Sequence, residues 1–282
     1  MTFTVDSIPI DGDPQRLGWA VFQDDQFLLH AGGLLSQSTV LDVIPIEWHT
    51  SVASACQAAC ESLMSHVVAE AAEQGVTSIR SLTRNDPLSF PTGGLDASGF
   101  NAVATLQEWT TSASLHTTPK RSIIFQRFPL DTLLSIEQTK LLTALLQNCL
   151  ENSQDLQSLE VPDATALLST WKTLYQSEAV LLNAHGENAG LAVISRESDS
   201  RRATLEYIGV SSAFRRRGYG RLLLRDAESL VASDAPAATT AFTAWCDREN
   251  HPAMQLYCKC GFTPEQIGQI WLRSVTPVLS ST

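Results

Sequence analysis

Residues 205–225 read LEYIGVSSAFRRRGYGRLLLR, and this stretch decides the fold of the second half of the chain. It opens with a short, mostly apolar run that ends at two serines, and an apolar segment of helical spacing follows an arginine-rich turn. Apolar runs bounded by turn residues predict strands, and apolar residues three and four apart predict a helix. The stretch therefore predicts a strand, a loop and a helix in succession.

The loop has the composition of an anion site. Gly218 and Gly220 lack a Cβ, so the main chain can adopt unusual φ/ψ values there and approach a ligand closely. The first amides of the following helix have no partner within the helix, and with the helix dipole they favour a phosphate group. Four guanidinium groups that can pair with phosphate oxygens flank the glycines: Arg215, Arg216, Arg217 and Arg221. The loop predicts a phosphate or pyrophosphate site, and a solvated basic turn is the alternative.

Two motifs, in the same order, resemble the GCN5-related N-acetyltransferase (GNAT) superfamily. Arg215, Gly218 and Gly220 stand at the spacing R/Q-x-x-G-x-G/A of the family's acyl-CoA pyrophosphate loop. Residues 250–262 read NHPAMQLYCKCGF and resemble the family's second signature, N-x-x-A-x-x-L-Y-x-K-x-G-F. The resemblance is specific over residues 179–273 and implies a mixed, mostly antiparallel sheet flanked by helices, an α/β (α+β) fold.

The resemblance also implies a site for acetyl-CoA as co-substrate. In the family, the main chain at the positions of Ile208 to Val210 pairs with the pantetheine arm and helps to polarise the thioester carbonyl. Asn250 would lie near the sulfur, and an N-cap of the following helix is the alternative role for its side chain. The expected cofactor-binding residues are Ile208, Gly209, Val210, Arg215, Arg216, Arg217, Gly218, Tyr219, Gly220, Arg221, Asn250 and Ala253.

Tyr257 occupies the place of the family's tyrosine that protonates the departing thiolate. A phenol has a pKa near 10 and a thiol near 8.5, so the phenol is still protonated at neutral pH and can donate. A core aromatic side chain on an amphipathic helix is the alternative.

Glu206 is the candidate general base. An alkyl amine with a pKa of about 10.4 is almost fully protonated at pH 7, so transfer to it needs a proton acceptor. Strand alternation predicts Glu206, Ile208 and Val210 on one face, and Leu205, Tyr207 and Gly209 on the other. The alternative role for Glu206 is a cross-strand ion pair with Arg201 or Arg202.

The charge of the chain is acidic overall and basic in one place. The 19 Lys and Arg residues and 30 Asp and Glu residues give a net charge of −11, which argues against a general binder of nucleic acid or acidic membranes. Eight of the 19 basic residues nevertheless fall within residues 196–225. This local charge fits one small polyanionic ligand, and the acidic balance favours a cationic acceptor such as a small-molecule or peptide amine.

The cysteines and the N-terminus indicate the compartment. The six cysteines have no zinc-type spacing, so we expect inert, reduced thiols and no metal. An acyl-cysteine intermediate at Cys246 would need a base partner that the sequence does not show. The chain begins without the pattern of a signal peptide and contains no apolar run of membrane-spanning length. We expect a cytoplasmic monomer or homodimer.

The N-terminal half shows the same predicted order of elements as the C-terminal half. Residues 17–35 read as two strands around a turn, followed by a strand at 40–48, a helix at 51–74 and strands at 76–82 and 103–109. Its strand-to-helix junction, PIEWHTSVAS at 45–54, has neither glycine nor arginine. The chain therefore resembles tandem GNAT proteins with one degenerate half, and generic α/β elements are the alternative.

We expect a degenerate GNAT-like domain at 1–115, a polar linker at 110–120 and a catalytic GNAT domain at 121–282. Two helices, at 135–150 and 163–175, would line the acceptor groove if the resemblance holds. The function implied is an acetyl-CoA-dependent N-acetyltransferase that transfers directly to a primary amine in a ternary complex. The alternative is a CoA-binding regulatory or scaffold module without turnover.

Overall fold

The computed structural model describes residues 2–9, 16–37, 39–49, 52–84, 89–115, 123–130, 132–151, 153, 163–174, 176–196, 202–234 and 241–276. Arg201 and residues 116–120, for which the sequence predicted an ion pair and part of a linker, lie outside these ranges. The chain divides into two compact units. Unit 1 contains residues 1–106 and 267–282, and unit 2 contains residues 107–266.

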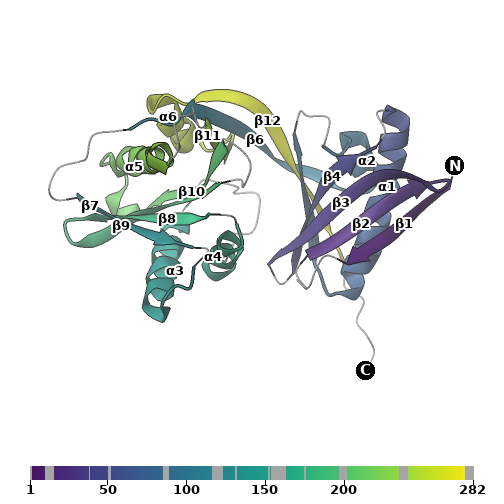
Figure 1. Ribbon diagram of the computed structural model, residues 1–282, viewed down its shortest axis with the longest axis horizontal. Helices are drawn as coiled ribbons and strands as arrows, with labels where there is room; N and C mark the ends of the chain where they lie inside the picture. The colour runs from purple at the N-terminus through teal and green to yellow at the C-terminus, as the bar shows by residue number, and fades with distance from the viewer. Residues whose placement is uncertain are drawn as a thin grey trace. The chain divides into compact units, whose positions relative to one another are not determined.

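Unit 1 is a sheet with its helices α1 and α2 (Figure 1). Its elements are β1 (Phe3–Pro9), β2 (Arg16–Gln23), β3 (Gln26–Gln37), β4 (Val40–Trp48), α1 (Ala53–Glu73), β5 (Ser78–Arg84), α2 (Thr92–Ala97) and the first part of β6 (Asn101–Ser112). Strands β1 to β4 pair antiparallel in sequence order, and β4 pairs parallel with β5.

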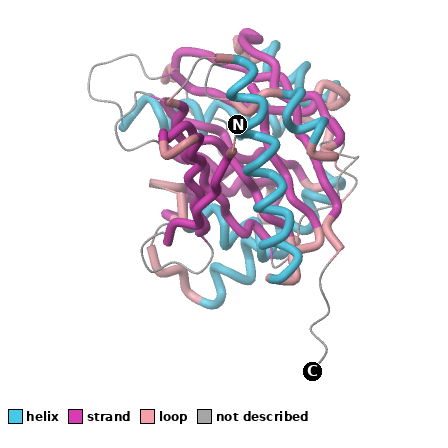
Figure 2. Tube along the Cα trace, turned by 90° about the vertical axis from the view of Figure 1, so that its right-hand side faces the viewer, coloured by secondary structure: helices cyan, strands magenta, loops and turns pink. Residues whose placement is uncertain are grey.

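Helix α1 packs along one face of this sheet. Its apolar side chains Leu63, Met64 and Val67 are fully buried, together with Trp19 and Leu41 of the strands. Figure 2 shows this long helix lying across the strands of the unit. The helix ends at Glu73 with Gln74 as its C-cap, and the next residue, Gly75, has a φ of +75° that suits a residue without a Cβ.

Unit 2 contains the remaining strands of the hydrogen-bonded strand order and two pairs of helices. Its elements are β7 (Ile123–Pro129), α3 (Ile136–Leu150), α4 (Ala164–Lys172), β8 (Glu178–Ala184), β9 (Glu187–Arg196), β10 (Arg202–Val210), the 3₁₀ turn η1 (Ser212–Phe214), α5 (Tyr219–Asp234), β11 (Ala241–Asp247), α6 (His251–Lys259) and the first part of β12 (Thr263–Ser274). Strands β7 to β10 pair antiparallel in sequence order, and β10 pairs parallel with β11.

The helices of unit 2 cover both faces of its sheet (Figure 1). Leu223, Leu224 and Tyr257, from α5 and α6, pack with the side chains of one face, which we call the α5 face. Leu142, Leu146 and Trp171 from α3 and α4 pack against the other, the α3 face. On β9, Ala192 and Ile194 belong to the α5 face, and Leu191 and Val193 to the α3 face, as strand alternation requires.

Strands β6 and β12 are each divided between the units. Strand β6 begins in unit 1 and ends in unit 2, whereas β12 begins in unit 2 and ends in unit 1. Within unit 1, residues 268–274 of β12 pair antiparallel with β5. Within unit 2, β6 is the neighbour of β11 in the strand order. Each unit thus takes a strand from the other half of the sequence, which a boundary at residues 115–121 does not anticipate.

The fold class expected from the sequence is confirmed. The strand pairing is mixed and mostly antiparallel with flanking helices, and the order of elements repeats in the two units. The strand at 40–48 and the helices beginning near residues 53, 136 and 164 lie where the periodicity placed them. The sequence did not reveal β1, and the short helix α2 lies in a stretch where a broken loop was expected.

The caps of α3 and α4 explain why these helices begin where they do. Ser135 Oγ accepts a hydrogen bond from the Gln138 amide, and Gln138 Oε1 accepts one from the Ser135 amide, forming a capping box. Asp163 caps α4 by accepting from the amide of Ala166. No helix in the described ranges combines the length and apolar composition that crossing a bilayer requires.

Candidate active site

Strands β10 and β11 separate from each other in the middle of the unit 2 sheet. They pair over four residues, from Arg202 opposite Ala241 to Leu205 opposite Ala244. Beyond that point, among the described residues 206–210 and 245–247, no further β10–β11 pairing occurs. One edge of β10 still pairs with β9 as far as Val210, so its other edge offers main-chain donors and acceptors to an extended ligand.

A β-bulge lies at the same place on β10. Leu205 pairs with Ile194 and Tyr207 with Val193, so Glu206 is the extra residue. Bulges redirect side chains and are frequent beside active sites. Here the bulge decides which way Glu206 faces.

The bulge corrects the simple alternation expected from the sequence. Leu205, Ile208 and Val210 pack on the α5 face, whereas Tyr207 packs on the α3 face. Glu206 accepts a hydrogen bond from Ser195, which follows Ile194 on β9 and therefore lies on the α3 face. Glu206 thus shares a face with Tyr207 and not with Ile208 and Val210, because one extra residue reverses the alternation.

Gly209 has a packing role that the sequence did not indicate. A Cβ added there would collide with the Tyr207 ring and with Cys149 of α3. The space beside Gly209 is therefore filled by protein on the α3 face, and only its main chain is available at the free strand edge.

The loop between β10 and α5 has two residues in the left-handed region. Arg216 has a φ of +60° and Gly218 a φ of +83°. A Cβ added at Gly218 would meet no atom within 4 Å, so the main chain there borders open space. The first described hydrogen bond of α5 runs from the Leu222 amide to the Gly218 carbonyl. The amides of Tyr219, Gly220 and Arg221 therefore precede the first intrahelical bond, as the anion site requires.

The Tyr219 side chain, and the position that a Cβ of Gly220 would take, face the protein rather than the loop. Tyr219 is buried on the α5 face and its ring lies 6.0 Å from that of Phe214. A Cβ at Gly220 would meet Leu256 at 3.6 Å, which is ordinary van der Waals contact. Any contribution of these two residues to anion binding therefore comes from their amides.

Arg215 differs from its neighbours, because its guanidinium is directed at main-chain carbonyls. It donates to Val210 O at 2.9 Å, to Cys149 O at 3.1 Å and to Glu151 O at 3.0 Å. Two of these carbonyls lie at the C-terminal end of α3, where a cation also interacts favourably with the helix dipole. The Arg215 side chain thus links the loop to α3.

The other arginines of the loop are exposed. Arg216, Arg217 and Arg221 all lie at the surface, and the Arg217 guanidinium stands 5.7 Å from the Phe214 ring. Of the four arginines that the sequence assigned to a phosphate site, these three are therefore the exposed ones.

The environment of Glu206 suits a proton acceptor. Burial raises the pKa of the Glu206 carboxyl above its usual range, and the hydrogen bond from Ser195 lowers it in part. The described ion pair of Arg202 is with Glu265, at 4.0 Å, and not with Glu206. A carboxylate with a raised pKa is a stronger base, which is the direction general-base catalysis favours.

Tyr257 lies in an aromatic cluster on the α5 face. Its residue is 4% exposed, and its ring centroid lies 6.1 Å from that of Trp109 and 5.5 Å from that of Phe262. This is the core environment that the sequence offered as the alternative to an acid. Burial in the cluster fixes the ring and does not by itself decide what the hydroxyl does.

Asn250 caps helix α6. Its Oδ1 accepts a hydrogen bond from the Ala253 amide at 3.1 Å. The N-cap that the sequence offered as one role for Asn250 is therefore present, and it also occupies the amide of Ala253.

Two buried thiols have the properties expected of inert cysteines. Burial raises the pKa of Cys60 to about 12. Burial also raises the pKa of Cys149 to about 12, although Arg215 lies close enough to oppose it. Neither thiol forms an appreciable thiolate at neutral pH, so neither is suited to nucleophilic chemistry.

Sequence reasoning did not single out two adjacent residues of β6. Among the side chains described, Glu108 Oε2 and Trp109 Nε1 are buried without a hydrogen-bond partner. Trp109 contacts Tyr257, and Glu108 is 2% exposed. A glutamate beside a tryptophan in an apolar strand was the available signal, but only the strand order shows that β6 completes unit 2.

The fold of unit 2, with β10 and β11 diverging in the middle of the sheet, is GNAT-like. Residues 140–262 match the family model for the acetyltransferase (GNAT) family. This part of the chain is therefore a GNAT-family domain.

Solved structures extend the likeness in fold to both halves. A tandem GNAT protein from the clavulanic acid biosynthesis pathway, solved without AcCoA, matches with a TM-score of 0.66 and 14% identity over 94% of this chain and 85% of that chain. A GCN5-related N-acetyltransferase from Sphaerobacter thermophilus matches with a TM-score of 0.62 and 13% identity over 95% of this chain and 84% of that chain.

A third match is the glucosamine N-acetyltransferase region of a fungal multi-domain GH3 β-N-acetylglucosaminidase. It has a TM-score of 0.64 and 13% identity over 96% of this chain and 38% of that chain. At these identities the likeness concerns the fold. No curated protein matches the chain.

Proposed function

We propose that unit 2 is an acetyl-CoA-dependent N-acetyltransferase that transfers the acetyl group directly to a primary amine in a ternary complex. The observation that carries this proposal is the free edge of β10, which lies directly before the loop of Gly218. An extended pantetheine arm fits the free edge of β10, and a diphosphate fits the loop of Gly218. The match of residues 140–262 to the GNAT family supports the same class of reaction.

In this proposal the cofactor is held mainly by the main chain. The amides of Tyr219, Gly220 and Arg221 bind the pyrophosphate, and Ile208 to Val210 pair with the pantetheine arm. Arg216, Arg217 and Arg221 supply positive charge at the surface, while Arg215 fixes the loop on α3. Asn250 and Ala253 shape the start of α6 beside the thioester.

Glu206 and Tyr257 divide the proton transfers between them. Glu206 accepts a proton from the acceptor ammonium, directly or through water, and the free amine attacks the thioester carbonyl carbon. The C–N bond forms, the C–S bond breaks, and the Tyr257 phenol donates its proton to the thiolate. The second proton that the acylated nitrogen loses passes through water to the Tyr257 phenolate, which restores the phenol. The proton transfers to Glu206 and from the Tyr257 phenol are each typically worth about 10²–10⁴-fold in rate.

The acceptor is proposed to be a cationic amine. The net charge of −11 favours such a molecule. The fungal relative of similar fold is a glucosamine N-acetyltransferase region, whose substrate carries a primary amine. For this chain we propose only that the acceptor carries a primary amine, and we do not propose that it is a sugar.

Thiol release from acetyl-CoA, measured with a panel of primary amines, tests the proposal. We expect release that depends on the amine and an acetylated product of the corresponding mass. The burial of Tyr257 favours the alternative, a CoA-binding module without turnover. Heat of acetyl-CoA binding in calorimetry, without release across a broad panel, would support that module. Absence of binding heat would refute both.

A further inference from the structure

Glu108 has a carboxylate oxygen that is buried and unpaired. The residue is 2% exposed, and its Oε2 has no hydrogen-bond partner among the described residues. Burying a carboxylate oxygen without a partner is costly, so native proteins seldom retain one without a reason. The missing partner is expected to be a hydrogen-bond donor, because an ionised carboxylate only accepts.

Glu108 lies on the α3 face of the unit 2 sheet. Its neighbour Trp109 packs with Tyr257 on the α5 face, so strand alternation turns Glu108 the other way. Thr243 of β11 follows Phe242 of the α5 face and hence shares the face of Glu108. Glu206 lies on that face too, beside Ser195.

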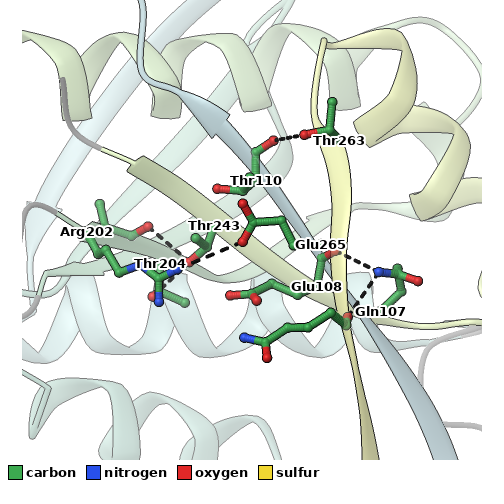
Figure 3. A network of polar contacts seen from close by, with 10 residues as sticks. Gln107, Glu108, Thr110, Arg202, Thr204, Thr243, Thr263 and Glu265 are labelled. Atoms are coloured by element: carbon green, nitrogen blue, oxygen red, sulfur yellow. Dashed lines mark hydrogen bonds and ion pairs between the residues drawn. The ribbon is translucent and has the colours of Figure 1, made fainter. Parts of the chain in front are cut away.

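Figure 3 shows the surroundings of Glu108. Its side chain extends away from the Gln107 amide, which donates to the Glu108 and Gln266 carbonyls at 3.0 Å each. The carboxylate is directed to the side on which Thr204 and Thr243 lie. On the next strand, Glu265 already has a cation at 4.0 Å, the Arg202 guanidinium, whereas Glu108 Oε2 has none in the described ranges.

We propose that Glu108 binds a second cationic group of the acceptor, separate from the amine that reacts beside Glu206. This inference rests on the proposed function. In the strand order, β6 and β10 are separated by β11, and neighbouring strands lie about 4.8 Å apart. The strands that carry Glu108 and Glu206 are therefore about 10 Å apart, and farther apart where β10 and β11 diverge. One ammonium cannot serve both, so the acceptor class is a diamine or polyamine whose cationic groups span that distance.

A homologous series of diamines measures this spacing directly. The probes are the linear diamines from diaminopropane to diaminooctane, each compared with the monoamine of equal carbon number. For the wild-type protein, kcat/KM should favour the diamine over its monoamine only among the longer members. Glu108→Gln, which keeps shape and removes charge, should reduce that preference at least about tenfold through KM. Monoamines should be affected little.

Glu265→Gln is the matched control. It removes a carboxylate on the neighbouring strand that already has its cation, and it should leave the preference for long diamines unchanged. A wild-type protein that treats diamines and monoamines alike overturns the proposal, even if Glu108→Gln does not fold. A folded Glu108→Gln that retains the preference overturns it as well.

The failure of the proposed function gives a different result. If no amine is acetylated, the same probes are titrated calorimetrically into the protein with CoA present. Tighter binding of long diamines that is lost in Glu108→Gln would then still support the Glu108 site, and equal binding of both series would refute it.

Discussion

The two units share an order of elements and differ where the chemistry would occur. In both, the middle of the sheet contains a parallel pair of strands that spans four residues: Val40–Val43 with Ser78–Ser81 in unit 1, and Arg202–Leu205 with Ala241–Ala244 in unit 2. In both, a helix follows the first strand of that pair. The sheet geometry that could open a site is therefore present twice.

The strand-to-helix junctions are different. Helix α1 begins after Val52, which has no side chain that can cap it. Helix α5 begins after Gly218, whose positive φ and open surroundings suit a close anion. A helix start alone does not make the site, since the loop before it must let a ligand approach the amides.

The second difference lies before a shared Gly-Phe pair. Phe100 donates its amide to Leu95 O at 3.0 Å, and Phe262 donates to Tyr257 O at 3.1 Å, with a positive-φ glycine before each phenylalanine. Leu95 therefore occupies in unit 1 the place of Tyr257 in unit 2, and it is fully buried. A leucine satisfies the packing and cannot donate a proton. Unit 1 retains the fold without the proposed acid.

Tyr257→Phe is expected to have the largest effect on activity. It makes unit 2 resemble unit 1 at this position, with an apolar side chain that still packs against Trp109 and Phe262. We expect kcat to fall about 100-fold or more because the thiolate loses its proton donor. Acetyl-CoA affinity by calorimetry and the melting temperature should change little. An unchanged kcat would mean that Tyr257 has only the core role that Leu95 has.

Arg215→Met tests the link between the loop and α3. The loss of three charge-assisted hydrogen bonds is expected to lower the free energy of unfolding by about 2 kcal/mol. The matched control is Arg216→Met, which is exposed and adjacent and should leave stability unchanged while weakening acetyl-CoA binding. Denaturant unfolding with both variants gives the comparison. Equal stabilities would show that Arg215 does not secure the loop.

The sequence was sufficient to predict the fold because the fold depends on periodic features. The apolar run at 40–48 and the helix starts at Ser135 and Asp163 are local patterns, and they formed the elements expected of them. Spacing of Gly218, Gly220 and Tyr257 likewise pointed to the family, since motif spacing is a property of the chain itself.

Features that depend on long-range pairing could not be predicted in this way. The bulge at Glu206 is a relation between β10 and β9, and it reversed the expected face of that side chain. The contribution of Glu108 and Trp109 to unit 2 depends on β6 lying beside β11, which no local pattern encodes. The sequence predicted Arg215 as a phosphate ligand because it shows the positive charge beside the glycines. It does not show that the guanidinium donates to main-chain carbonyls of α3 and its C-cap.

Gly218→Ala tests the loop that unit 1 lacks. A Cβ at a φ of +83° strains the backbone by about 1–2 kcal/mol and also projects toward open space where a phosphate would lie. Gly186→Ala is the matched control, since Gly186 has a φ of +88° and equally open surroundings in the β8–β9 turn. Both variants should lose similar stability in denaturant unfolding. Only Gly218→Ala should weaken acetyl-CoA binding, by about tenfold, and equal affinities would remove the loop from the cofactor site.

Ser195→Ala is expected to have the smallest effect and to change only the pH dependence. Burial holds the pKa of Glu206 above its usual range, and the Ser195 hydrogen bond opposes that rise. Without Ser195 the pKa of Glu206 rises further, so less of the base is ionised at low pH. The acidic limb of kcat/KM should therefore move to higher pH, and activity should recover as the pH is raised. Ser114→Ala removes a hydrogen bond of 2.8 Å to Glu228, a carboxylate of α5 with no proposed role, and should leave the profile unchanged. If both variants or neither shift the limb, the group that titrates in catalysis is not Glu206, and the base must be sought among the other carboxylates of the α3 face.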